Sequence, residues 1–148
     1  LLEDTRGMYD HQVESMGKVC VSTELGGGGT TNPYSIAIAK QGVENFLIHT
    51  GILRQSALPQ PNASQHLVMN QNSYVFSEHQ GLLEPCVSLG EKVAVDQFIA
   101  RIHVIERTDQ KPQSYYAPRG GIIMARHVPS LIKMGDCLQV IASLEQQF

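Results

Sequence analysis

The chain has 148 residues, of which 42% are hydrophobic and 17% charged, and its formal net charge is -3. This length and the apolar runs fit one domain, or a small domain with part of another, and exclude a disordered chain. This slightly negative net charge gives no sign of the basic surface that binds nucleic acids or anionic membranes. No apolar run approaches the roughly 18 residues of a membrane span. We therefore expect neither nucleic acid nor a membrane as a partner.

The N-terminal third of the chain predicts a strand, a glycine loop and a helix. Residues 1–17 have no sustained hydrophobic period and are expected to form a loop or a frayed helix end. Residues 18–25 are a short β-branched run that predicts a buried strand, and four glycines follow it. Asn32 before Pro33 is a helix-start signal, and apolar residues at helical spacing then run to Gly51, which predicts the helix end.

Residues 54–65 hold two prolines and three glutamines without an apolar period, which is typical of a surface linker. We place a boundary there, between domains at 1–54 and 55–148. Beyond it, short apolar runs alternate with turn signals, a pattern that favours an all-β sandwich or barrel. The runs are 67–69, 74–77, 81–87, 97–105, 114–117, 121–126 and 137–142.

Two stretches of the second region, 81–104 and 121–143, resemble each other. The matched positions are Gly81 with Gly121, Gly90 with Gly135, and Ile102 with Ile141. Such self-similarity predicts two copies of one supersecondary unit, each burying its apolar face against the other. A β-sandwich with two-fold symmetry is therefore expected.

Cys20, Cys86 and Cys137 are widely spaced and form no C-x-x-C pair. Their odd number and spacing disfavour both a disulfide framework and a structural zinc site. We interpret them as reduced and mostly buried thiols of a cytoplasmic protein.

The strongest local motif is Glu24, which ends the predicted strand just before the glycine run at 26–29. A carboxylate at the C-terminal end of a strand, beside a loop whose backbone can approach a ligand closely, lies where open α/β sheets bind substrates. Glu24 is therefore a candidate general base. The alternative is an exposed strand-end carboxylate beside glycines that only turn the chain. The spacing matches neither glycine-rich phosphate-binding motif, which disfavours a nucleotide site.

Two other motifs suggest different chemistry. His11 and Glu14 form an H-x-x-E pair that can reach one zinc ion if a third ligand arrives from elsewhere, although six histidines make chance pairs easy. Lys111 lies between the two halves of the repeat, where biotinyl and lipoyl carriers place their modified lysine. Because Pro112 follows it in place of a small residue or Met, we interpret Lys111 as a solvated loop lysine. A non-catalytic biotinyl/lipoyl-like binding or interaction module is the alternative function.

The chain resembles the C-terminal part of the succinylglutamate desuccinylase/aspartoacylase family, and most of all its N-acetyl-diaminobutyrate deacetylases. The resemblance covers residues 18–143 and rests on VCVSTELGGGG, GLLEPCVSLGEKV and YAPRGGIIMARHVPSLIKMGDCLQVIA. It implies an α+β, mainly β chain. The strand, glycine loop and helix would belong to a zinc carboxypeptidase-like α/β domain, and the β region would be a barrel-sandwich hybrid of the biotinyl/lipoyl type.

Members of this family are zinc-dependent amidohydrolases, so the resemblance implies removal of an acyl group from an N-acylated amino acid or diamino acid. It assigns Glu24 the activation of a zinc-bound water and the transfer of a proton to the leaving amine. Gly26 and Gly27 would shape the floor beside the substrate. A tyrosine of the β region, Tyr115 or Tyr116, would complete the pocket, and we select Tyr116.

The family's zinc ligands, an H-x-x-E and a later His, lie well upstream of the glutamate, and His11 to Glu14 is too close to Glu24 to be that motif. Zinc is therefore expected in the full-length parent, with its ligands absent from this chain. We expect a C-terminal fragment that is inactive alone. Its apolar surfaces should drive self-association into a homo-oligomer.

Overall fold

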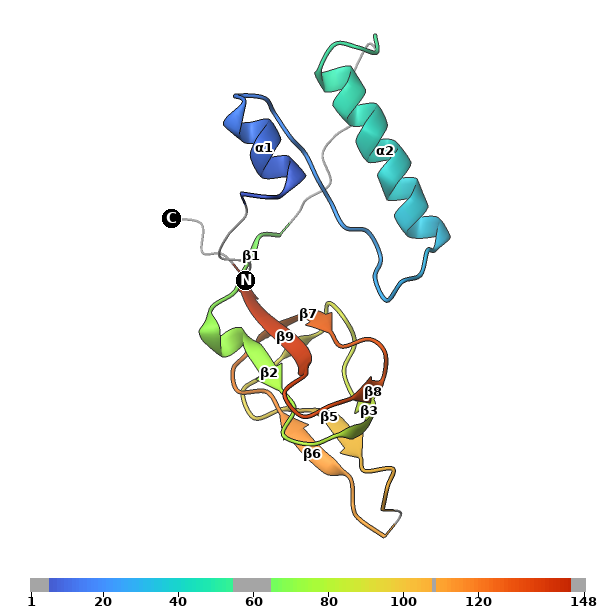
Figure 1. Ribbon diagram of the computed structural model, residues 1–148, viewed down its shortest axis with the longest axis vertical. Helices are drawn as coiled ribbons and strands as arrows, with labels where there is room; N and C mark the ends of the chain where they lie inside the picture. The colour runs from blue at the N-terminus through green and yellow to red at the C-terminus, as the bar shows by residue number, and fades with distance from the viewer. Residues whose placement is uncertain (1–5, 55–64, 108, 145–148) are drawn as a thin grey trace. The chain divides into compact units, whose positions relative to one another are not determined.

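The computed structural model describes residues 6–54, 65–107 and 109–144. The chain divides into two compact units, residues 1–60 and 61–148 (Figure 1). The division falls inside the linker predicted at 54–65, most of which lies outside the described residues. The domain limits 1–54 and 55–148 stay a prediction. As expected, the described residues form a mainly β chain with two α-helices.

The first unit contains helices α1 (Tyr9–Ser15) and α2 (Pro33–His49). Helix α1 lies in the stretch predicted to be a loop or a frayed helix end, where a short helix forms. No helix in the described part of the chain is long and apolar enough to cross a membrane.

Helix α2 begins where its sequence predicts. The Asn32 side chain accepts a hydrogen bond from the Ser35 N–H at 2.9 Å, and the Ser35 hydroxyl accepts one from the Asn32 N–H at 3.4 Å. This reciprocal capping box, with Pro33 in the first turn, satisfies donors that a helix N-terminus otherwise leaves unpaired. The helix is capped at Thr50, and Gly51 has a φ of +77°, a left-handed conformation that glycine adopts without penalty.

The buried strand predicted at 18–25 is wrong. These residues form no strand, and Val19 and Val21 are 81% and 72% exposed. A strand needs a neighbour to satisfy its backbone hydrogen bonds, and residues 6–54 contain no strand at all. The β-branched sequence is therefore present without the sheet that it requires.

The first unit also lacks an apolar core among its described residues. Only Ser35 is buried within residues 6–54, whereas Ile36, Val43 and Phe46 of α2 are exposed. Helices in proteins gain most of their stability by packing an apolar face against other elements. The apolar residues of α2 thus lack the cover that they would have inside a folded domain.

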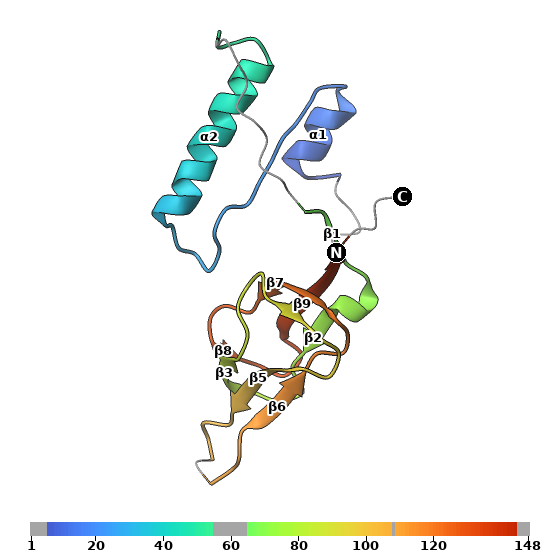
Figure 2. The ribbon, with the colours of Figure 1, turned by 180° about the vertical axis from the view of Figure 1, so that it is seen from behind.

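The described part of the second unit is built from antiparallel strands (Figure 2). The elements are β1 (Leu67–Val68), the 3₁₀ helix η1 (Gln71–Ser73), β2 (Tyr74–Phe76), β3 (Gly81–Pro85), β4 (Lys92–Val93), β5 (Phe98–His103), β6 (Gln113–Tyr116), β7 (Gly121–Arg126), β8 (Leu131–Ile132) and β9 (Cys137–Leu144). One sheet has the order β1-β9-β7-β4, with β2 also paired to β9, and the other has the order β6-β5-β3-β8. Each of the seven predicted apolar runs overlaps a strand.

The two halves of the repeat exchange their short strands. Strand β4 of the first half pairs with β7 of the second, and β8 of the second pairs with β3 of the first. The register is equivalent, because Gly81 faces Ile132 and Gly121 faces Val93. This exchange confirms the predicted repeat of two mutually supporting units. Assignment as a barrel-sandwich hybrid stays a prediction.

The core of the β unit is aliphatic. The matched residues Ile102 and Ile141 are both fully buried. The buried cluster consists of Val75, Leu83, Val87, Val93, Ile99, Ala100, Ile102, Ala117, Ile123, Ile132, Leu138 and Ile141. These side chains come from both halves, so the core joins the two copies of the repeat.

The predicted alignment is wrong at one turn, because the equivalent of Gly135 is Asp96 rather than Gly90. The N–H of Asp96 donates to the Ala117 carbonyl at 2.8 Å, and the N–H of Gly135 donates to the Ser77 carbonyl at 2.7 Å. Asp96 has a φ of +61° and Gly135 a φ of +92°. One half therefore uses an aspartate where the other uses glycine in the left-handed region.

We expect Asp96→Gly to raise the free energy of unfolding by about 0.5 to 1 kcal/mol, because glycine adopts this conformation without the steric cost of a Cβ. The reverse change, Gly135→Asp, should lower it by a similar amount. Urea denaturation followed by circular dichroism measures both. A loss of stability in Asp96→Gly would contradict the proposed equivalence of the two turns.

All three cysteines are free. Cys86 is exposed, and Cys20 and Cys137 are half-buried, so the prediction that they are mostly buried is wrong. Partial burial raises the pKa of the Cys137 thiol. The pKa of the Cys86 thiol is also raised, mainly by the smaller desolvation at that position.

Candidate functional site

Glu24 lies on the segment that connects α1 to the glycine loop. Side chains of this segment alternate between two hollows, as they would on the two faces of a strand. Cys20, Ser22 and Glu24 line the first hollow, Val21 and Leu25 line the second, and Thr23 borders both. The second hollow is completed by apolar residues of α2. The segment therefore keeps the two-faced pattern of a strand although it pairs with no neighbour.

The hollow that contains Glu24 has a volume of about 440 Å³. Tyr9 and Asp10, at the start of α1, and Ser22 line it together with Glu24. The glutamate is exposed, so its carboxylate is open to a ligand in this hollow. A carboxylate within reach of a bound water can take up a proton, which is the chemistry expected of a general base.

The glycine loop follows directly after Leu25. Gly26 to Gly29 have φ values of +88°, +141°, +64° and +68°, so every residue of the run lies where an L side chain would be strained. Thr30 closes the loop by donating to the Gly27 carbonyl from its N–H at 3.2 Å and from its hydroxyl at 3.0 Å. Within the described residues, the N–H groups of Gly26 and Gly27 donate no backbone hydrogen bond.

The structure distinguishes the two tyrosines of β6. The Tyr115 hydroxyl accepts a hydrogen bond from the Glu78 N–H at 3.0 Å and lies 2.7 Å from His79 Nδ1. Tyr116 is 55% exposed, and its ring centre lies 5.8 Å from that of Phe98. Tyr115 is therefore engaged within the β unit, whereas the Tyr116 hydroxyl is accessible. Glu24 belongs to the first unit and Tyr116 to the second.

The H-x-x-E pair lies on α1, where the His11 N–H donates to the Asp10 carboxylate at 2.8 Å. Within residues 6–54, 65–107 and 109–144, no three His, Cys, Asp or Glu side chains come together as a metal site. The zinc that the family resemblance implies thus finds no donor set in the described chain. His11 and Glu14 gain no third ligand there.

Lys111 lies on the exposed connection between β5 and β6, and its carbonyl accepts a hydrogen bond from Gln113 Nε2 at 3.4 Å. Its interpretation as an ordinary solvated lysine stays a prediction.

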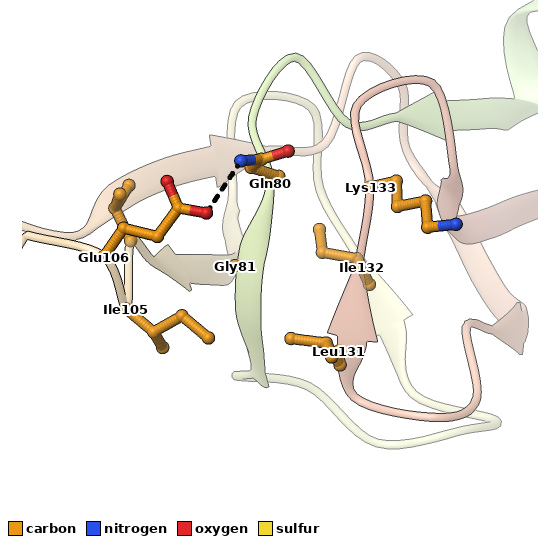
Figure 3. Close-up of a pocket in the computed structure, with 8 residues that line it drawn as sticks. Gln80, Gly81, Ile105, Glu106, Leu131, Ile132 and Lys133 are labelled. Carbon is orange, nitrogen blue, oxygen red and sulfur yellow. Dashed lines mark hydrogen bonds between the residues drawn. The ribbon is translucent and has the colours of Figure 1, made fainter.

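A separate hollow in the β unit, of about 270 Å³, contains none of the predicted site residues (Figure 3). Ile105 and Leu131 form its apolar lining, and Gln80 Nε2 donates to Glu106 Oε1 at 3.2 Å across one side. Lys133 lies on the other side (Figure 3). Because Glu106 is hydrogen-bonded to Gln80 and none of the candidate residues lies here, we assign this hollow no catalytic role.

One charged cluster lies on the outer face of β3 and β5. His103 Nε2 donates to Glu84 Oε2 at 2.7 Å, and Arg101 lies 3.8 Å from the other carboxylate oxygen. This hydrogen bond, followed by the charge of Arg101, holds the pKa of Glu84 below its ordinary value against the opposing effect of desolvation. Because all three side chains are substantially exposed, we interpret the cluster as a surface ion pair.

The chain matches no protein-family model. It is 44% identical over 143 residues to the N-alpha-acetyl-L-2,4-diaminobutyric acid deacetylase of Halomonas elongata, a match that covers 95% of this chain and 42% of the relative. The product-bound structure of an ectoine utilization protein from Ruegeria pomeroyi is 48% identical, with a TM-score of 0.85 over 97% of this chain and 44% of that one.

A succinylglutamate desuccinylase from Silicibacter sp. TM1040 is 47% identical, with a TM-score of 0.86 over 98% of this chain and 44% of that one. The chain therefore spans less than half the length of the relatives that it matches. These similarities extend over nearly all of its residues and include both the glycine-loop unit and the β unit. The chain belongs to the succinylglutamate desuccinylase/aspartoacylase family.

Proposed function

We propose that this chain is the C-terminal part of a cytoplasmic, zinc-dependent amidohydrolase that removes the acyl group from an N-acylated amino acid or diamino acid. The observation that carries the proposal is Glu24, exposed in a hollow beside a loop of four left-handed glycines. The similarity to a deacetylase of an N-acetylated diamino acid over 95% of the chain supports this substrate class.

In this proposal Glu24 takes a proton from the water that attacks the acyl carbonyl carbon. The carbon–nitrogen bond then breaks, and Glu24 passes the proton to the leaving amine, so that a carboxylic acid and a free amine result. The N–H groups of Gly26 and Gly27 border the substrate, and the Tyr116 hydroxyl completes the pocket in the parent enzyme. In this proposal zinc is held by residues of the parent outside this chain; among the described residues, no three His, Cys, Asp or Glu side chains come together as a metal site.

The exposed apolar residues of the first unit support the view that it belongs to a larger domain. Residues 18–25 have the composition of a buried strand, and Ile36 and Val43 of α2 are 45% and 60% exposed. A parallel sheet covered on both faces would bury such a strand and such a helix. We propose that the parent's zinc carboxypeptidase-like domain supplies this sheet, and that the β unit is a barrel-sandwich hybrid.

The 148-residue chain alone should show no deacylase activity and should retain almost no zinc after dialysis. The full-length protein should hold about one zinc ion per chain, as catalytic zinc sites do. Amine release from N-acetyl-diaminobutyrate and metal analysis by mass spectrometry measure the two properties. Stoichiometric zinc in the short chain that is lost in His11→Ala or Glu14→Gln would contradict the proposal and place the metal on α1.

The isolated chain should also self-associate, because α2 exposes apolar side chains that a partner can cover. We propose a homo-oligomer and expect Val43→Lys, which places a charge among these side chains, to shift it toward monomer. Gln41→Lys, at an exposed polar position of the same helix, is the matched control. Sedimentation velocity over a range of concentrations measures the effect, and a wild-type chain that stays strictly monomeric would refute it.

A further inference from the structure

The four glycines after Glu24 carry no side chains that could hold their own loop. Glycine loses more conformational freedom on ordering than any other residue, so a run of four is costly to fix. Only Leu25 separates this run from Glu24. The contacts that fix the glycine loop therefore also determine where the Glu24 carboxylate lies.

Thr30 makes the direct contact to this loop. Its N–H and its hydroxyl both donate to the Gly27 carbonyl, at 3.2 and 3.0 Å, and the two residues form an isolated antiparallel bridge. Its neighbour Thr31 is also exposed but makes no side-chain hydrogen bond within the described residues. The two adjacent threonines thus differ in this contact to the loop.

The capping box of α2 supports the loop from the other side. A Cβ placed on Gly26 would lie 3.5 Å from the Thr30 carbonyl oxygen, 3.8 Å from Ser35 Oγ and 3.9 Å from Asn32 Nδ2. The Ser35 hydroxyl is itself held by donation to the Asn32 carbonyl at 3.0 Å. Gly26 therefore lies close to the first turn of a 17-residue helix, whereas nothing lies within 4 Å of a Cβ added to Gly27.

We propose that Thr30 is a positioning residue for the reaction: through its two hydrogen bonds to Gly27 it fixes the glycine turn and keeps the Glu24 carboxylate in its hollow. The inference rests on the proposed function, in which Glu24 transfers the proton. Thr30 acts through the backbone and touches no reacting atom. Its loss should therefore lower kcat and leave KM unchanged, because proton transfer is sensitive to displacement of the base while ground-state binding is not.

The test uses three variants of the full-length enzyme that contains this chain. Thr30→Val keeps the shape and removes the hydroxyl, and we expect kcat to fall by about 3- to 10-fold with KM unchanged, as for the loss of one hydrogen bond. Thr30→Ser restores the hydroxyl and should stay within about 2-fold of wild type by the same reasoning. Thr31→Val is the matched control and should behave like wild type.

A readout independent of activity comes from the 148-residue chain itself. Hydrogen exchange of the backbone amide at position 30 should accelerate in Thr30→Val and not in Thr31→Val. In Thr30→Val the hydroxyl bond to Gly27 is lost, so the amide bond alone closes the loop and opens more often. Wild-type kcat and wild-type exchange in Thr30→Val would overturn the inference, as would equal losses in Thr30→Val and Thr31→Val. Failure of the proposed function has a different signature, which is full activity in Glu24→Gln.

Discussion

Gly81→Ala and Gly121→Ala should each destabilise the β unit by about 3 kcal/mol or more, or prevent it from folding, because the added methyl group would overpack against the backbone of a neighbouring strand. A Cβ on Gly81 would overlap the His103 carbonyl oxygen, and a Cβ on Gly121 would overlap the Ala142 carbonyl oxygen. Both oxygens belong to the backbone of a paired strand, β5 or β9. Neither can move aside without separating strands that carry the core.

The equivalence of these two glycines sharpens the test. Gly81 faces β8 as Gly121 faces β4, but of these two glycines only Gly81 has a positive φ, of +150°, so Gly81→Ala should fail at least as severely as Gly121→Ala. Gly90→Ala is the matched control, since Gly90 has a φ of +82° but nothing within 4 Å of an added Cβ. We expect it to lose only about 1 kcal/mol through backbone strain. Urea denaturation compares the variants, and equal losses at Gly81 and Gly90 would show that the close backbone approach is unimportant.

The β unit could largely be predicted from the sequence because its elements are determined within the chain. Each half supplies the strands that the other half needs, so the apolar runs and the matched Gly81 and Gly121 contain the necessary information. Strands β4 and β8 were not predicted, because each has only two residues and lies outside the apolar runs of the sequence. The turn at Asp96 was misaligned because a residue other than glycine occupies a left-handed position, and composition does not reveal this.

The first unit shows the opposite case. Residues 18–25 have a strong local preference for strand, yet β propensity expresses packing against neighbours more than a property of the backbone itself. Residues 6–54 contain no strand with which this segment could pair. Its strand preference is therefore visible only in side chains that alternate between two hollows. The hydrogen bonds from Thr30 to the loop could not be predicted, because the residues around Asn32 carry only the signals of a helix start. Hydrogen bonds across a glycine turn leave no periodic signal.

The different surroundings of Tyr115 and Tyr116 also became visible only in the structure. Both tyrosines are adjacent in β6, and adjacent residues of a strand face opposite sides, so one must point inward. The sequence does not state which, because the run at 113–116 has no clear apolar alternation. The hydrogen bond from the Glu78 N–H identifies Tyr115 as the inward residue, and the selection of Tyr116 for the pocket stays a prediction.

Glu24→Gln in the full-length enzyme should lower kcat by about 100- to 10,000-fold, the range expected for loss of a general base, with a much smaller change in KM. Glutamine keeps the size of the side chain and can still form hydrogen bonds, but it cannot accept the proton of the attacking water. Steady-state release of the free amine measures the loss. The zinc content should stay at the wild-type value, since the ligands are proposed to lie elsewhere in the parent.

Glu14→Gln is the control that makes this result decisive. Glu14 is also an exposed carboxylate of the first unit, and it belongs to the H-x-x-E pair that offers the competing explanation. If Glu24 is the base, Glu14→Gln should keep wild-type activity and zinc, because α1 then has only a structural role. If Glu14→Gln instead loses both while Glu24→Gln keeps them, the metal and the reaction belong to α1. The glycine loop would then be only a turn between an exposed carboxylate and a helix, and the assignment of Glu24 would be wrong.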